Sequence, residues 1–144
     1  MKELIMKYGL HKAWALAAIA MLGSLYFSNV LLLPPCELCW YQRIAMYPLV
    51  WILAVGIFRK DRLVWVYALP LAVIGWVIGI YHNLLYYKII PESLAPCIQG
   101  VSCTTKQLEW FGFLTIPLMS LIAFTALVVI LAAYAWTERH EQRN

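Results

Sequence analysis

Residues 113–136 read FLTIPLMSLIAFTALVVILAAYAW, a run of apolar side chains interrupted only by isolated threonine, serine and proline residues. A helix needs about 20 apolar residues to cross a hydrocarbon core about 30 Å thick. Three further runs of about this length precede it, at about 13–33, 39–58 and 63–82. Spans in lipid must be helical, because isolated strands would leave backbone groups unpaired there. The sequence therefore predicts an all-α membrane protein, a four-transmembrane-helix bundle in which residues 1–144 form a single domain.

The composition excludes an ordinary water-soluble domain. Apolar residues make up 64% of the chain and charged residues 12%, against about 45–50% and about 25% in soluble proteins. The net charge of +4 could indicate a nucleic-acid partner. However, the basic side chains lie mainly in the tails and in one short turn, and form no stripe on a soluble face. We expect membrane lipid as the main solvent and no nucleic acid as a partner.

The basic residues predict the orientation of the bundle. Most of them lie before the first run, between the second and third runs, and in the tail: Lys2, Lys7, Lys12, Arg59, Lys60, Arg62, Arg139 and Arg143. Because positive segments stay inside, both termini of this multi-pass protein are expected to be cytoplasmic. Segments 34–37 and 83–112 then form two extracytoplasmic loops. The first run is too long for a signal-peptide core of about 7–15 residues, so we expect it to be kept as a span.

All four cysteines fall on the predicted outer side. Cys36 and Cys39 lie where the first loop enters the second span, and Cys97 and Cys103 lie in the second loop. An outer face meets an oxidising compartment, in which disulfides form and persist. The spacing favours the pairs Cys36–Cys39 and Cys97–Cys103, although four cysteines allow three pairings. The second pair could also simply brace its loop.

The Cys36/Cys39 pair has the features of a reactive disulfide rather than a structural one. A bond across so short a loop adds little chain-entropy stabilisation. Pro34 and Pro35 suit a helix entry, where the positive helix end favours thiolate, as does Arg43 one turn further along. An inert clip is the simpler alternative. A zinc site fits the spacing and the oxidising compartment poorly, so we expect no metal.

Residues 36–49 read CELCWYQRIAMYPL, and this run closely resembles the signature of the DsbB family of membrane disulfide oxidoreductases, especially its short BdbC branch. The likeness extends to the four spans, to both cysteine pairs and to the Gly112-Phe113…Ile116-Pro117 entry into the last span. It implies a multi-pass enzyme of the bacterial cell membrane that reoxidises an extracytoplasmic thioredoxin-fold thiol oxidase of the DsbA or BdbD type. The electrons would pass to a membrane quinone, ubiquinone or menaquinone, which would support disulfide bond formation in exported proteins. The short branch suggests menaquinone.

The resemblance also implies a role for each site residue. Cys97 matches the cysteine that the partner attacks, and Cys103 matches the one that exchanges with Cys36. Cys39 matches the thiolate that faces the quinone, and Arg43 matches an arginine of the quinone site. In the longer branch the second-loop cysteines are far apart, whereas here only five residues separate them. This short spacing predicts a smaller loop motion during exchange.

The sequence also offers a histidine as a candidate site residue and leaves two alternative functions open. His82, at the outer end of the third span, could donate a hydrogen bond or a proton to a quinone carbonyl, although a lone histidine is more often a satisfied polar group. The protein could instead be a non-enzymatic scaffold whose disulfides brace its loops. It could also be a quinone–thiol enzyme of the vitamin K epoxide reductase kind. That type carries its quinone-proximal Cys-x-x-Cys late in the bundle, whereas here the motif opens the second span.

Overall fold

The computed structural model describes residues 2–94, 109–110 and 114–143. Within these residues the chain forms four long helices: α1 (Lys2–Asn29), α2 (Glu37–Arg59), α3 (Trp65–Tyr86) and α4 (Ile116–Gln142). Three short elements lie between α3 and α4 in the sequence: η1 (Glu92–Leu94), β1 (Glu109–Trp110) and its antiparallel partner β2 (Leu114–Thr115). Each long helix contains a stretch long and apolar enough to cross a membrane. The prediction of an all-α protein with four membrane helices is therefore confirmed.

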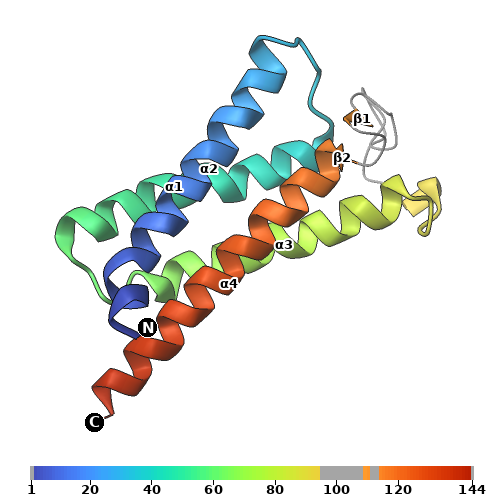
Figure 1. Cartoon of the computed structure of the whole chain (residues 1–144). Coiled ribbons are helices and arrows are strands. Elements are labelled where there is room, and N and C mark those ends of the chain that lie inside the picture. Colours follow the sequence, from blue (N-terminus) through green and yellow to red (C-terminus); the bar gives the residue numbers. More distant parts are fainter. Residues whose placement is uncertain (1, 95–108, 111–113, 144) are drawn as a thin grey trace.

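The two ends of the bundle differ in what they contain. Both termini and the α2–α3 turn lie at one end, and the α1–α2 connection, β2 and the start of α4 lie at the other (Figure 1). Ion pairs from Arg62 to Glu138 and Glu141 join the α2–α3 turn to the last turns of α4. The basic turn and the C-terminal tail therefore share one end, as a common side of the membrane would require.

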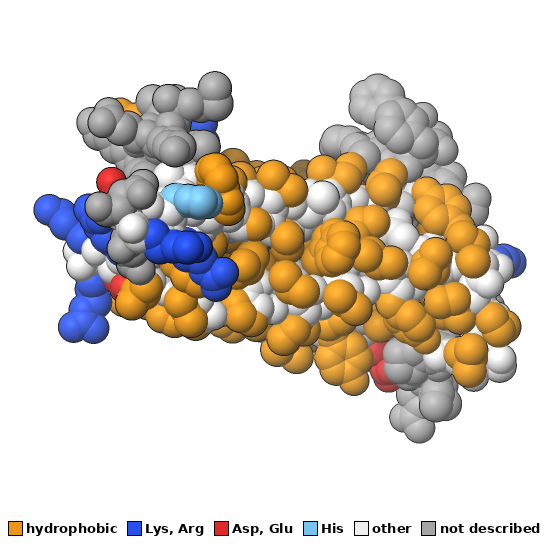
Figure 2. All heavy atoms as spheres, turned by 90° about the horizontal axis from the view of Figure 1, so that it is seen from below, with side chains coloured by type: hydrophobic (Ala, Val, Ile, Leu, Met, Phe, Trp, Pro, Cys, Tyr) orange, Lys and Arg blue, Asp and Glu red, His pale blue; other side chains and the backbone are white. Residues whose placement is uncertain are grey.

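Large apolar side chains cover the outside of the bundle. Several of them are more than half exposed: Ile19, Leu22, Trp51, Phe58 and Val129. Figure 2 shows hydrophobic side chains over the middle of one face, with lysine and arginine side chains gathered mainly at one end. Soluble monomers rarely expose continuous apolar patches of more than a few hundred Å². This surface is what contact with lipid requires.

Helices α3 and α4 pack closely because α3 carries glycine where they meet. A Cβ atom on Gly75 would clash with the ring of Phe124, which is 1% exposed and lies in the core. A Cβ atom on Gly79 would lie 3.4 Å from Leu121 Cδ1. The four-residue spacing of the two glycines places both on one face of α3, and this face receives α4.

The first helix ends before the apolar run does. The run predicted a span to about Leu33, but α1 ends at Asn29. Leu32 has a left-handed backbone (φ 53°), and the N–H of Leu33 turns back to the carbonyl of Phe27 at 3.0 Å. The prolines that follow disfavour helical angles in the residue before them. Hydropathy therefore continues past the last helical turn, because backbone geometry and not apolarity ends the helix.

The last helix begins at Ile116, three residues after the expected start at Phe113, which lies outside the described residues. Thr115 is its N-cap, and its hydroxyl oxygen accepts a hydrogen bond from Leu118 N at 3.4 Å. Pro117 occupies the first turn, where a proline needs no backbone partner.

Candidate functional site

Cys36 and Cys39 lie together at the start of α2. Cys36 is the N-cap residue, with an extended backbone (φ −73°, ψ 170°), and Trp40 N donates to its carbonyl oxygen at 3.1 Å. Both residues are free thiols, and their sulfur atoms are 2.8 Å apart. A disulfide bond is about 2.05 Å long, so a small movement would allow the bond to form. The helix start therefore holds this pair ready for reversible disulfide chemistry.

His82 of α3 lies beside Cys36. Its Nε2 atom is 3.7 Å from Cys36 Sγ, and the residue is only 1% exposed. Its other ring nitrogen, Nδ1, has no hydrogen-bond partner among the described residues. The sequence predicted His82 at the outer end of the third span, and the structure brings its imidazole against Cys36. An imidazole in this position can exchange a proton with the thiol.

The surroundings of Cys36 favour its thiolate. The hydrogen bond from the Cys39 thiol is the largest influence and lowers the pKa of Cys36 below its ordinary value; His82 also lowers it, against the opposing effect of burial. The positive end of α2 acts in the same direction as the two lowering contacts. The resemblance implied a thiolate at Cys39, whereas the contacts of the reduced pair stabilise one at Cys36.

The two thiols and the imidazole also form a set of potential metal donors. Their ligand atoms all lie within 4.8 Å of one another, and zinc accepts two cysteines and a histidine. Two thiolates on tetrahedral zinc would be about 3.8 Å apart, because each Zn–S bond is about 2.3 Å. The observed 2.8 Å between the sulfurs is shorter than this distance. The geometry favours dithiol chemistry over zinc binding.

Arg43, one turn beyond Cys39, is held by oxygen atoms of α1. Its Nε donates to Ser24 Oγ at 2.9 Å, and its Nη2 donates to the Ser24 carbonyl at 3.0 Å and to Ser28 Oγ. Its guanidinium carbon also lies 5.4 Å from the centre of the Trp40 ring, within the range of a cation–π contact. Sequence reasoning did not identify Ser24 and Ser28, because single serines are common in membrane helices.

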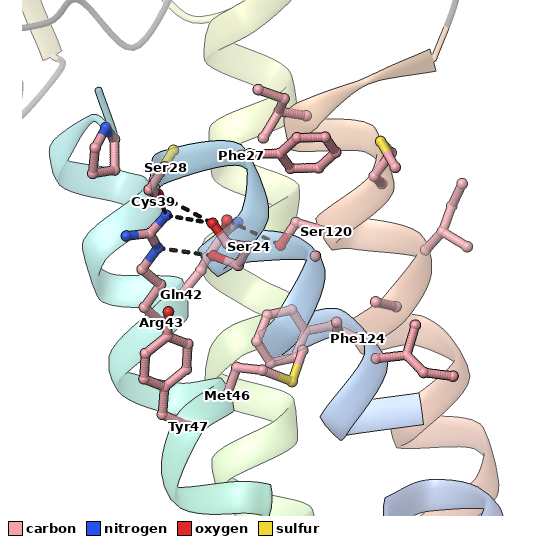
Figure 3. Close-up of a pocket in the computed structure, with 18 of the residues that line it drawn as sticks. Ser24, Phe27, Ser28, Cys39, Gln42, Arg43, Met46, Tyr47, Ser120 and Phe124 are labelled. Carbon is pink, nitrogen blue, oxygen red and sulfur yellow. Dashed lines mark hydrogen bonds between the residues drawn. The ribbon is translucent and has the colours of Figure 1, made fainter. Parts of the chain in front are cut away.

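A cavity of about 490 Å³ opens beside Cys39 and Arg43, between α1, α2 and α4 (Figure 3). Its walls are mainly apolar and include Phe27, Met46 and Phe124. Polar side chains gather near its end at Cys39: Ser24, Ser28, Gln42, Arg43 and Ser120. Small-molecule sites typically have about 300–1,000 Å³ of mostly apolar space and a few polar groups. The cavity has the size and lining expected of such a site.

The cavity does not include every aromatic or titratable residue near the thiols. Trp40 and Tyr41 follow Cys39 in sequence, but they do not line the cavity and are 54% and 50% exposed. His82 does not line it either. Cys39 therefore borders the cavity, while Cys36 lies on the side of His82.

A buried polar link joins three helices below the thiols. Ser120 Oγ donates to Gln42 Oε1 at 3.0 Å, so the link connects α4 to α2. Asn83 Nδ2 donates to the carbonyl oxygens of Gly79 and Pro117, both at 2.9 Å, which connects α3 to α4. Gln42 and Asn83 are each 6% exposed. Hydropathy alone does not reveal this link, because it depends on which way each side chain faces.

The predicted second pair, Cys97 and Cys103, lies outside the described residues. Its roles, and its pairing, stay predictions.

Comparison with known proteins identifies the family. The family model "Disulfide bond formation protein DsbB" matches residues 10–134. The chain is 48% identical over 122 residues to "Disulfide bond formation protein C" of Bacillus subtilis (strain 168), which covers 85% of this chain and 88% of that protein. It is 48% identical over 129 residues to "Probable disulfide formation protein C 2" of Bacillus anthracis, covering 89% and 91%. No solved structure matches the chain.

These matches agree with the four membrane helices and with the adjoining thiols at the start of α2. The chain belongs to the DsbB family of disulfide bond formation proteins and is a multi-pass membrane disulfide oxidoreductase.

Proposed function

We propose that this enzyme oxidises a thioredoxin-fold thiol oxidase outside the cell membrane and delivers the electrons to a quinone through Cys36 and Cys39. The observation that supports this most directly is the cavity that borders Cys39 and has Arg43 at its polar end. A dithiol that only braced a loop would need neither the cavity nor the cation.

The residues around the cavity fit a quinone. A quinone has a flat apolar ring with carbonyl oxygens at its edge, so it needs apolar walls and a hydrogen-bond donor. Phe27, Met46 and Phe124 supply apolar walls, and Arg43 supplies the donor. When bound, the quinone would take up two electrons and two protons from a dithiol. We expect Cys39, which lines the cavity, to be the thiol from which these electrons leave.

The contacts of Cys36 suit the opposite task, exchange with another disulfide. In disulfide exchange, a thiol with a lower pKa leaves faster as a thiolate, and the Cys39 thiol and His82 both favour the thiolate of Cys36. His82 can hold the proton that Cys36 releases, since its Nε2 is 3.7 Å from the sulfur. In this proposal the imidazole of His82 assists exchange at Cys36, and the cavity brings the quinone to Cys39.

The second pair would connect this site to the protein partner. In the proposed relay, the partner's dithiol becomes a disulfide as the Cys97–Cys103 disulfide is reduced. The resulting Cys103 thiolate then attacks Cys36, which forms a Cys103–Cys36 bond and releases Cys39. Cys97 next attacks Cys103, which releases Cys36 and reforms the Cys97–Cys103 bond. Each exchange breaks one disulfide and forms one, so two electrons move inward at every step. The basic turn and tail predict cytoplasmic termini, which puts both pairs on the outer side.

Turnover by the purified protein tests the proposal. The protein is mixed in detergent with menaquinone or ubiquinone and a reduced DsbA-type dithiol protein, and quinone reduction is followed. We expect turnover by the parent and none by Cys39→Ser. Absence of turnover with a competent partner, or full turnover by Cys39→Ser, would refute the proposed relay.

A further inference from the structure

We infer that Ser24 and Ser28 of α1 are positioning residues, which hold the Arg43 guanidinium in the orientation that receives a carbonyl oxygen of the quinone. This inference rests on the proposed function, because it assumes that the cavity beside Cys39 binds the quinone. It adds a role for α1, a helix that carries none of the cysteines.

The two serines form one acceptor surface. They are four residues apart, so their side chains lie on the same face of α1, one turn apart. Ser28 Oγ donates to the carbonyl of Ser24 at 3.1 Å, and its oxygen then accepts from Arg43 Nη2. The Ser24 carbonyl accepts from both groups, since it has two lone pairs. The hydrogen bond to the Ser24 carbonyl therefore fixes the Ser28 hydroxyl, so that its oxygen is free to accept from Arg43.

The contacts fix the plane of the guanidinium as well as its place. Nε binds Ser24 Oγ at 2.9 Å while Nη2 binds the Ser24 carbonyl at 3.0 Å. Two parallel bonds along one edge of a planar group leave it little freedom to rotate. Within the described residues the third nitrogen, Nη1, donates no hydrogen bond, so its two N–H groups are left for a ligand. A lysine could keep the charge but could not reproduce this edge contact.

The serine oxygens that accept from Arg43 are neutral, so the arginine keeps its positive charge. This charge favours a quinone, whose oxygen atoms become more negative as it is reduced. Ser24, Ser28 and Arg43 all line the cavity, and within the described part of the chain Arg43 forms no ion pair. Hydroxyl and carbonyl oxygens satisfy the donors without cancelling the positive charge. A carboxylate in place of either serine would hold the arginine equally well but would neutralise it. The serines thus orient a cation that still attracts an electron-rich oxygen.

A simpler reading is that the serines only satisfy a buried cation and tie α1 to α2. That reading predicts a loss of stability and no specific loss of quinone affinity. The two readings can be separated by measuring the KM for menaquinone, the KM for the reduced dithiol protein and the thermal unfolding temperature in the same detergent. Thr137→Val is the matched control, since it removes a hydroxyl that also donates to its own helix, at the Ala133 carbonyl, away from the cavity.

The test uses Ser24→Ala, Ser28→Ala, the double variant and Arg43→Lys in the full-length enzyme. We expect the double variant and Arg43→Lys to raise the KM for menaquinone about tenfold. The KM for the dithiol protein should change less than about twofold. Ser24→Thr, which keeps the hydroxyl, should restore most of the affinity lost in Ser24→Ala. Thr137→Val should leave both KM values at the parent level.

A double-mutant cycle with Arg43→Ala decides the mechanism. If the serines act through the arginine, replacing them in Arg43→Ala causes no further rise in the KM for menaquinone. An additional rise would mean that the serines contact the quinone themselves and would overturn the positioning role. An unchanged KM in the double serine variant, with Arg43→Ala impaired, would also overturn it while leaving the proposed function intact. If the parent reduces no quinone, the proposed function itself fails.

Discussion

Two arginines at opposite ends of the bundle each reach another helix, but they meet different partners. Arg62, in the turn after α2, lies 3.7 Å from Glu138 and 3.4 Å from Glu141 of α4. In the part of the chain that the structure describes, Arg43 of α2 donates only to serine oxygens of α1 and forms no ion pair. A carboxylate cancels the charge of its arginine, whereas a hydroxyl or carbonyl oxygen leaves that charge in place.

This difference in partners indicates different roles: Arg62 joins two helices through ion pairs, whereas Arg43 keeps a charge that can attract a ligand. Arg62 is 63% exposed, so water can solvate it, and its ion pair with the exposed Glu141 adds little. An arginine in a membrane span costs about 2.5–3.5 kcal/mol at mid-span, and a glutamate partner would be the direct remedy. Among the described residues Arg43 has no such partner, and it lies next to a cavity and a dithiol. An arginine whose charge is not neutralised by a carboxylate is expected where the ligand presents electron-rich oxygen atoms, as a quinone does.

The largest expected effect comes from removing each arginine in turn. Arg43→Ala should weaken apparent quinone affinity about 10- to 100-fold, because a hydrogen bond to a charged donor contributes about 1.5–3 kcal/mol. Arg62→Ala should change it less than about twofold. Quinone titrations of the two purified variants measure both values. Equal losses would show that the two ends of the bundle do not differ in the way their contacts suggest.

A larger side chain in the cavity tests quinone binding at the Arg43 end of the bundle without changing a polar group. Gly23 lines the cavity, and a Cβ atom there would meet nothing within 4 Å. Gly23→Leu should therefore place its side chain in the quinone space and weaken affinity about tenfold, a loss of about 1.4 kcal/mol. Gly23→Ala is the matched control, since one methyl group leaves most of the space open and favours the helix. If Gly23→Leu bound quinone as well as the parent, the quinone would have to bind elsewhere.

Much of the fold follows from the sequence because lipid imposes a simple rule. A run of about 20 apolar residues must be a helix, and the four runs predicted the four helices. The ends were less predictable. Leu33 is as apolar as any residue of the first run, yet the helix ends at Asn29, because the backbone turns before Pro34.

The site was predicted where the chemistry is local in sequence, and missed where it depends on helix rotation. The Cys-x-x-Cys spacing and Arg43 one turn later already indicate a reactive dithiol beside a cation. Nothing in the sequence shows that Ser24 and Ser28 face that arginine, because a serine on any face of a membrane helix reads the same. The approach of His82 to Cys36, across 46 residues, likewise requires the packing of α3 against α2.

The two ends should also differ in their response to pH. The pKa of Cys36 is lowered by Cys39 and then by His82, so the reduced protein should gain stability as the pH rises from the folded-state pKa to about 8.5, the ordinary thiol value. It should lose that stability as the pH falls through the folded-state pKa. At the other end, the pKa of Asp61 is lowered by the Tyr67 hydroxyl, and its contribution should be lost only below about pH 3.9.

Alkylation of the reduced protein measures the thiol directly, with mass spectrometry to identify the modified cysteine. The pH at which Cys36 becomes reactive should rise in His82→Ala and rise further in Cys39→Ala, because the Cys39 contact is the larger influence. A variant at the opposite end of the bundle, Tyr67→Phe, should leave this pH unchanged. If His82→Ala also left it unchanged, the imidazole would have no part in the state of the thiol.

The smallest expected effect belongs to the ion pairs of Arg62. Glu141 is 58% exposed, and exposed pairs contribute about 0–1 kcal/mol, so Glu141→Gln should lower stability by less than about 0.5 kcal/mol. Arg62 keeps Glu138 as a partner in this variant, which limits the loss further. Thermal unfolding at low and high salt should give nearly the same small difference, and quinone affinity should match the parent. A clear loss of quinone affinity in Glu141→Gln would mean that the two ends are coupled through α4, and that the orientation of Arg43 is not set by its serines alone.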